Sequence, residues 1–185
     1  HTSSRRQRQM CIRDSFIVMA PSSENELCNS IATSLHINDR PSAFRYPRGE
    51  GIGEKINEKP EIWEIGKAKL IREGSKVCIL SLGTRLKDSL VASEILASYG
   101  LPTTVVDARF AKPIDELLIT QLARDHEVLI TVEEGSIGGF SAQVMSFLTK
   151  TGALDKGLKF RPIFFPDVFI TVSYTHLRAH ETNVD

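Results

Sequence analysis

Arg48 is the residue of this chain whose type and position are best suited to bind a charged ligand. It lies in the run Arg45–Gly49, directly after a short stretch with the alternation of a strand. A guanidinium pairs with phosphate through two parallel hydrogen bonds, and ligands of α/β proteins bind beyond the carboxyl ends of strands. The residues alone leave two interpretations open, a phosphate contact or a solvated arginine that closes a turn.

Other charged residues near strand ends are expected to be structural. Arg45 alternates with Phe44 and Tyr46, so it faces the other side of its strand, and we expect it to form a structural ion pair. Asp107 and Arg109 have the i, i+2 spacing that puts both on one face of a strand, where they are expected to pair.

Glu133 and Glu134 have the appearance of a paired catalytic acid and base. Adjacent residues of a strand point to opposite faces, so the two carboxylates cannot share one site. Helix capping and pairing between domains are the favoured roles. Gly135, Gly138 and Gly139 lack the spacing of a dinucleotide-binding loop and indicate a tight turn before a helix.

No combination of metal-ligating residues has a convincing pattern. His176 and His180 have helical spacing, but no glutamate follows His176 directly and no other signal indicates a helix there. Cys11, Cys28 and Cys78 are odd in number and form no CxxC pair, which argues against a disulfide framework or a zinc cluster. We therefore expect no metal site and a reducing, cytoplasmic location.

Composition excludes several classes of function. The 23 basic residues are balanced by 23 acidic ones, and they are interspersed rather than gathered into the basic face that nucleic-acid binding requires. No apolar run approaches the roughly 20 residues of a membrane span. We expect no nucleic-acid partner and no membrane association.

Short apolar strands alternate with helices, which is typical of an α/β fold with a mostly parallel sheet. The first unit covers residues 16–53 and reads strand, helix, strand. Ser23 and Glu26 have the spacing of a capping box at the start of its helix. That helix carries apolar residues at helical spacing, namely Leu27, Ile31 and Leu35.

A second, larger unit is expected over residues 62–170, after a charged linker at 54–61. Its strands and helices alternate and indicate a mostly parallel five-stranded sheet. The helix that follows Gly83 has apolar residues on one face: Leu86, Leu90, Val91, Ile95 and Leu96. The two ends, 1–15 and 171–185, are polar without apolar periodicity, and we interpret both as non-native segments.

Three long motifs, supported by two shorter ones, carry a family resemblance. They are RPSAFRYPRGEG at 40–51, DARFAKPIDE at 107–116 and HEVLITVEEGSIGGF at 126–140, with MAPSSENEL at 19–27 and PDVFI at 166–170. With these motifs in this order, residues 16–170 resemble the 1-deoxy-D-xylulose-5-phosphate synthase family of the transketolase superfamily. The resemblance implies that residues 16–53 end a parallel-sheet pyrimidine-binding domain and that 62–170 form a transketolase C-terminal domain.

The resemblance also implies a reaction and a set of partners. Enzymes of this family use thiamine diphosphate and Mg²⁺ to condense pyruvate with glyceraldehyde 3-phosphate, giving 1-deoxy-D-xylulose 5-phosphate and carbon dioxide for isoprenoid and thiamine synthesis. They are homodimers. Arg48 matches the family arginine that binds the phosphate of the aldehyde. The cofactor and catalytic residues of the family lie before residue 16, so we expect a fragment that is inactive alone.

Two alternatives of different classes stay open. The chain is then either a non-catalytic α/β assembly domain or a fragment of a transketolase or a 2-oxo-acid dehydrogenase beta subunit. The sequence upstream of Phe16 separates the assembly domain from an enzyme fragment, and an assay with pyruvate and glyceraldehyde 3-phosphate separates the enzymes from one another.

Overall fold

The computed structural model describes residues 15–47, 51 and 53–166 of the 185-residue chain. Arg48 and both histidines of the His176/His180 pair lie outside the described residues. So do both predicted non-native segments, apart from Ser15.

The larger sheet has five strands in the order β3-β5-β4-β7-β8. Four of them run parallel, and β3 alone pairs antiparallel with β5, which confirms the prediction of a mostly parallel five-stranded sheet. The strands are β3 (Lys69–Arg72), β4 (Val77–Ser81), β5 (Thr103–Asp107), β7 (Val128–Val132) and β8 (Lys159–Ile163).

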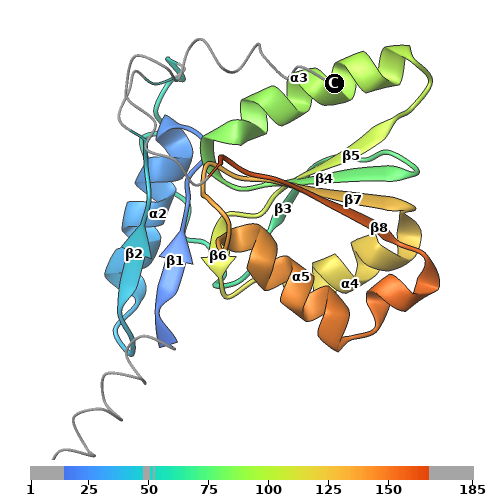
Figure 1. The fold of residues 1–185 in the computed structure, drawn as a ribbon. Helices are drawn as coiled ribbons and strands as arrows, with labels where there is room; N and C mark the ends of the chain where they lie inside the picture. The colour runs from blue at the N-terminus through green and yellow to red at the C-terminus, as the bar shows by residue number, and fades with distance from the viewer. Residues whose placement is uncertain (1–14, 48–50, 52, 167–185) are drawn as a thin grey trace, which may run out of the picture.

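Helices cover both faces of this sheet (Figure 1). On one face lies α3 (Leu86–Ser98), which the 3₁₀ turn η1 (Gly83–Arg85) precedes; on the other lie α4 (Glu116–Asp125) and α5 (Phe140–Lys150). A second 3₁₀ turn, η2 (Ala153–Lys156), leads into β8. This three-layer arrangement follows from the crossover helices that parallel strands require.

The core lies between the central strands and the helix pair α4 and α5. β5 is buried along its whole length, as expected for a central parallel strand. On α3, by contrast, Val91 and Ile95 are about half exposed, whereas Ser89 and Ser93 are buried. The predicted apolar face of this helix is therefore only partly directed into the core. Fully buried apolar side chains of the core include Cys78, Leu80, Val106, Leu129, Val144 and Leu148.

A smaller sheet, in the order β2-β1-β6, joins the two units expected from the sequence. Its middle strand β1 (Ile17–Met19) pairs parallel with β2 (Ser42–Phe44) and antiparallel with β6 (Phe110–Lys112). Because β6 follows β5 in the larger unit, the two units share this sheet.

Helix α2 (Glu24–His36) packs beside the smaller sheet and begins as predicted, because Ser23 accepts a hydrogen bond from the backbone N–H of Glu26. Two of its apolar residues are exposed, while three of its polar residues are buried. Ile31 is 42% and Leu35 76% exposed, whereas Asn29, Ser30 and Thr33 are buried.

The buried polar face of α2 binds the segment that connects the two units. Each contact runs from a backbone N–H of residues 53–63 to a side-chain oxygen of the helix. The pairs are Gly53 with Glu24 at 2.7 Å, Asn57 with Asn25 at 2.7 Å, Glu61 with Asn29 at 2.7 Å and Trp63 with Thr33 at 2.9 Å. The charged segment at 54–61 is thus attached along α2.

Candidate functional site

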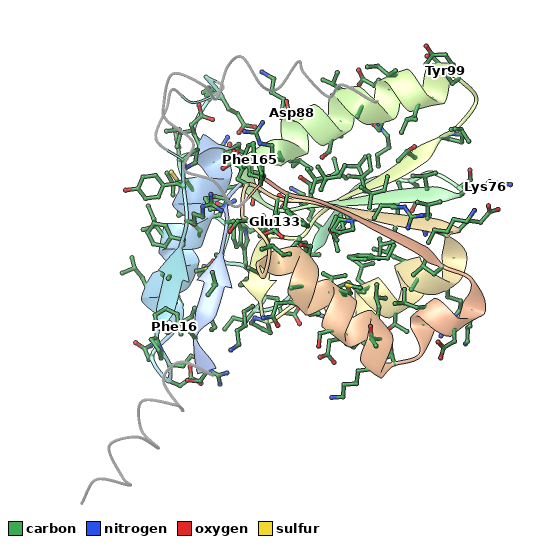
Figure 2. The ribbon with its side chains drawn as sticks, viewed as in Figure 1. Phe16, Lys76, Asp88, Tyr99, Glu133 and Phe165 are labelled. Atoms are coloured by element: carbon green, nitrogen blue, oxygen red, sulfur yellow. The ribbon has the colours of Figure 1, made fainter. Side chains whose placement is uncertain are left out.

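A crevice of about 140 Å³ lies at the carboxyl ends of β4 and β7. The chain leaves β4 toward β5 on one side and returns to β7 on the other, so the loops after these two strands diverge. Such a switch point is where open α/β sheets bind ligands. Figure 2 shows Glu133 and Phe165 at this end of the sheet and Lys76 at the opposite end.

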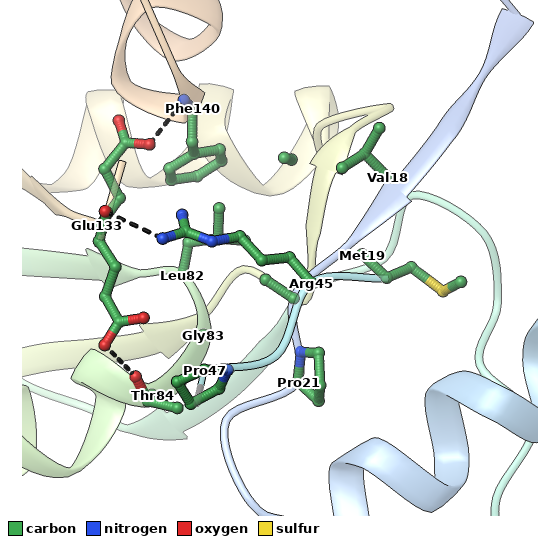
Figure 3. Close-up of a pocket in the computed structure, with 13 residues that line it drawn as sticks. Val18, Met19, Pro21, Arg45, Pro47, Leu82, Gly83, Thr84, Glu133 and Phe140 are labelled. Carbon is green, nitrogen blue, oxygen red and sulfur yellow. Dashed lines mark hydrogen bonds between the residues drawn. The ribbon is translucent and has the colours of Figure 1, made fainter. Parts of the chain in front are cut away.

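Apolar side chains form most of the walls of the crevice, and a few polar ones are placed among them (Figure 3). Residues at the ends of β1 and β2 and just after them supply one side, including Met19, Pro21 and Pro47, and the β4 and β7 loops supply the other. The polar residues are Arg45, Thr84, Glu133 and Glu134.

Glu133 caps the N-terminus of α5 from outside the helix, whose N-cap position is Gly139. Glu133 is only 5% exposed. Its carboxylate accepts hydrogen bonds from the backbone N–H groups of Phe140 at 2.9 Å and Ser141 at 2.8 Å. The Ser141 hydroxyl donates a third at 2.6 Å. A Cβ at Gly135 or Gly139 would clash with this carboxylate. The predicted capping role and the predicted glycine turn are confirmed, although Glu133 is buried rather than solvated.

Glu134 points to the other side and holds the β4 loop. Its Oε1 accepts a hydrogen bond from Thr84 Oγ1 and pairs with Arg85 at 3.1 Å. Arg85 also pairs with Asp88 at 2.9 Å and lies over the Phe165 ring, 5.4 Å from its centroid. The two adjacent glutamates therefore serve different elements, as the strand alternation predicted.

The predicted ion pair of Arg45 is wrong for the described residues. Arg45 Nη2 instead donates to the backbone carbonyl of Glu134 at 3.1 Å, and the guanidinium extends across the crevice (Figure 3). The Glu134 carboxylate is already directed at Thr84 and Arg85, which leaves its carbonyl oxygen as the acceptor. This bond joins the two units through the backbone of Glu134; the predicted pairing between units by the glutamate carboxylates is not found among the described residues, where the Glu134 carboxylate pairs within its own unit.

A second polar cluster lies beside the crevice at the end of β5. Asp107 is 1% exposed, and its oxygens accept hydrogen bonds from Ser22 Oγ at 2.7 Å and from the backbone N–H of Arg109 at 3.1 Å. Burial raises the pKa of Asp107 to about 6, against the smaller lowering by these two bonds. Asp107 and Arg109 do associate, but through the arginine backbone rather than its guanidinium.

The Arg109 guanidinium is directed at α2 instead. It pairs with Glu26 at 3.2 Å and lies 4.8 Å from the centroid of the Trp63 ring. The residue lies between β5 and β6 and has a left-handed backbone, with φ of 55°. Sequence reasoning missed Ser22, Glu26 and Trp63 here, because contacts between such distant residues leave no periodic signal.

The described residues do not fit a magnesium or thiamine diphosphate site. Within them, no group of three histidine, cysteine, aspartate or glutamate side chains is arranged to hold a metal ion.

Burial raises the pKa of the Cys78 thiol to about 12, so this cysteine is no nucleophile. Among the helices of the described part, none has the length and apolar content to span a membrane.

Comparison with known proteins places these features in a family. Residues 66–181 match the model described as "Transketolase, C-terminal domain". A solved structure described as "Split gene transketolase, inactive beta4 tetramer" is similar over 87% of this chain, with 26% identity and a TM-score of 0.75. The chain spans about half of that structure, 52% of its length.

Proposed function

The chain belongs to the transketolase C-terminal domain family, whose model matches residues 66–181, and from this membership we propose that it is part of a thiamine-diphosphate-dependent synthase. The proposed reaction joins pyruvate and glyceraldehyde 3-phosphate, giving 1-deoxy-D-xylulose 5-phosphate and carbon dioxide. The proposed cellular location is the cytoplasm.

The observation that carries the choice of reaction is the run Arg45–Gly51, the motif that resembles the synthase family most specifically. Its first residue bonds to Glu134 O, and Pro47 lines the crevice. Arg48 follows Pro47 directly and lies outside the described residues. Its proposed role is to bind the phosphate of glyceraldehyde 3-phosphate, which suits the planar guanidinium.

The cofactor is proposed to bind elsewhere in the complete enzyme. The described residues lack a magnesium ligand set, and the crevice is too small for thiamine diphosphate. The proposed contribution of this chain is then structural and substrate-binding: Arg45, which precedes Arg48 in the chain, is bonded to the backbone of Glu134 in the C-terminal domain.

A non-catalytic assembly role is the second candidate, and the description of the structural neighbour favours it. That protein is a split transketolase whose tetramer is described as inactive. A chain of this kind would supply an interface, as a homodimer or a larger oligomer, and another polypeptide would supply the cofactor site. Under both candidates, this chain alone makes no product.

The deciding experiment uses the gene extended upstream of Phe16 until the reading frame begins. The purified product, with Mg²⁺ and thiamine diphosphate, is assayed with pyruvate and glyceraldehyde 3-phosphate, then with ketose and aldose phosphates, and then with 2-oxo acids and an electron acceptor. Release of carbon dioxide only when both pyruvate and the aldehyde are present supports the synthase. Ketol transfer between sugar phosphates would instead indicate a transketolase, and oxidative decarboxylation would indicate a 2-oxo-acid dehydrogenase. Inactivity in all three assays would favour the assembly role.

A further inference from the structure

The crevice at the carboxyl ends of β4 and β7 has unused bonding groups of both charges. On one side, Arg45 donates one hydrogen bond, from Nη2 to the backbone carbonyl of Glu134. Within the described residues, its guanidinium has no other hydrogen bond or ion pair, and the residue is exposed. A guanidinium in this state is suited to bind a carboxylate through two parallel bonds.

The negative group of the crevice is Glu134. Its Oε1 already receives Thr84 and Arg85, while Oε2 accepts no hydrogen bond within the described part of the chain. Glu133, the other lining carboxylate, has its three donors in and around the α5 N-terminus and is structural. Glu134 therefore provides the acceptor for a cationic donor.

The remaining walls and the volume limit the ligand to a small molecule with an apolar part. Pro21, Leu82, Ala111 and Phe140 line the crevice with carbon atoms. A volume of about 140 Å³ holds on the order of five water-sized atoms. That is the size of glycine or alanine and far below that of a nucleotide.

We propose that this crevice binds a small amino acid in its zwitterionic form. The ligand carboxylate pairs with Arg45, its ammonium donates to Glu134, and a short side chain contacts Pro21, Leu82 and Phe140. This proposal concerns a ligand other than the substrates of the proposed reaction, and it does not depend on that reaction.

Charge argues against the simpler ligands. A phosphate or a plain carboxylate would pair with Arg45 but would also lie beside the carboxylates of Glu133 and Glu134, which repel an anion. A plain amine would satisfy Glu134 and leave the guanidinium without an anion. A ligand with both charges makes two charge-assisted contacts where a singly charged one makes one, so the zwitterion is the ligand that uses both groups.

The test is a titration of the ¹⁵N-labelled chain, followed by the amide resonances of Gly83, Thr84, Glu134 and Gly135. L-alanine is the probe, propionate and ethylamine lack one charge each, and inorganic phosphate tests a simple anion. We expect saturable shifts with L-alanine and a Kd on the order of 1 mM. Propionate and ethylamine should bind at least about tenfold more weakly, because each lacks one charge-assisted contact.

Two variants and a control tie the binding to the named groups. Arg45→Met and Glu134→Gln should each weaken L-alanine binding by about tenfold or more. Arg40→Met is the matched control, since Arg40 forms an exposed pair with Asp39, and its Kd should not change. The amide spectra of all three variants report whether the fold is kept, and Glu134→Gln retains an acceptor for Thr84 if Arg45→Met fails to fold.

Several outcomes would overturn the proposal. They are the absence of saturable shifts at these amides, equal affinity for propionate and L-alanine, and unchanged binding after either substitution. Tighter binding of phosphate than of L-alanine would make the crevice an anion site. None of these results bears on the synthase reaction, which is assayed separately in the complete enzyme.

Discussion

The carboxylate of Asp107 accepts the hydroxyl hydrogen of Ser22 at 2.7 Å, although the two residues are 85 positions apart in sequence. Ser22 lies between β1 and α2, and Asp107 ends β5. The bond thus connects the smaller sheet to the centre of the larger one, inside a region closed to solvent. Because Asp107 is the acceptor, the contact between the two units depends on the charge of this one buried carboxylate.

Asp107→Asn should change how stability depends on pH. Burial raises the pKa of Asp107 from 3.8 to about 6 in the folded chain. Because the folded chain binds this proton more tightly than the unfolded chain, Asp107 contributes its full stabilisation below about pH 4. That stabilisation is lost as the pH rises from about 4 through 6. The loss amounts to about 3 kcal/mol, and asparagine cannot undergo it. In urea unfolding at pH 4, 5, 6 and 7, the free energy of unfolding of the variant should increase relative to that of the parent chain as the pH rises, by about that amount in all. Parallel curves for the two proteins would contradict the prediction.

Glu133→Gln should destabilise the fold although the side chain keeps its size. The amide presents one oxygen instead of two to the N–H groups of Phe140 and Ser141, and it removes the negative charge from the start of α5. A loss of about 2 to 4 kcal/mol in the free energy of unfolding is expected. Glu127→Gln, which removes an exposed pair with Lys76, should cost about 0.5 kcal/mol or less. Equal effects in urea unfolding would rule out the capping role.

Arg109→Met should loosen α2 from the larger unit. The substitution removes the pair with Glu26 and the contact with the Trp63 ring while keeping an apolar chain of similar length. Because Glu26 then keeps, among the described residues, only the more exposed Lys69 at 3.7 Å as its cationic partner, we expect a loss of about 1.5 to 3 kcal/mol. The fluorescence of Trp63, the chain's one tryptophan, gives a local readout and should shift to the red. Arg109→Lys should restore part of the stability but not the stacking, and an unshifted emission in Arg109→Met would count against the contact.

Thr33→Val should weaken the attachment of the connecting segment to α2. Valine has nearly the shape of threonine but leaves the backbone N–H of Trp63 without its acceptor, which costs about 1 to 3 kcal/mol at a buried position. Thr120→Val is the matched control, because the Thr120 hydroxyl is exposed and bonds only to Glu116 of its own helix. Amide exchange at residues 61–63 should quicken in Thr33→Val only.

Arg48→Ala belongs to the complete enzyme. Losing a charge-assisted contact to phosphate costs about 1.5 to 3 kcal/mol, so kcat/KM for glyceraldehyde 3-phosphate should fall by roughly ten- to 150-fold. Affinity for pyruvate should barely change, and Arg48→Lys should recover part of the loss. An unphosphorylated aldehyde is the control acceptor. Equal losses with both acceptors would remove the phosphate role of Arg48.

Local chemistry predicted the elements whose causes are local. The strand and helix alternation indicated the five-stranded sheet, Ser23 indicated the start of α2, and the alternation of Glu133 and Glu134 separated their roles. In each case, the residues that determine the feature lie within a few positions of one another, so spacing alone carries the information.

Features that depend on distant partners were not predictable. Leu27, Ile31 and Leu35 have helical spacing, which does not reveal that Asn29 and Thr33 are buried because their side chains bind the backbone of residues 61–63. Arg45 was expected to form an ion pair but donates to the backbone carbonyl of Glu134, because the Glu134 carboxylate is already bonded to Thr84 and Arg85. Tertiary contacts override periodicity at both places.

The pairing of β1 with β6 also bears on how the chain is made. Met19 is opposite Phe110 in the smaller sheet, so β1 leaves the ribosome about 90 residues before its antiparallel partner. At roughly 5 to 20 residues per second of synthesis, that delay is on the order of 5 to 20 s. During this interval, one edge of β1 has no strand to pair with, and unpaired edges promote association between chains. Translation therefore leaves this edge exposed to association with other chains, and slower synthesis would lengthen that exposure.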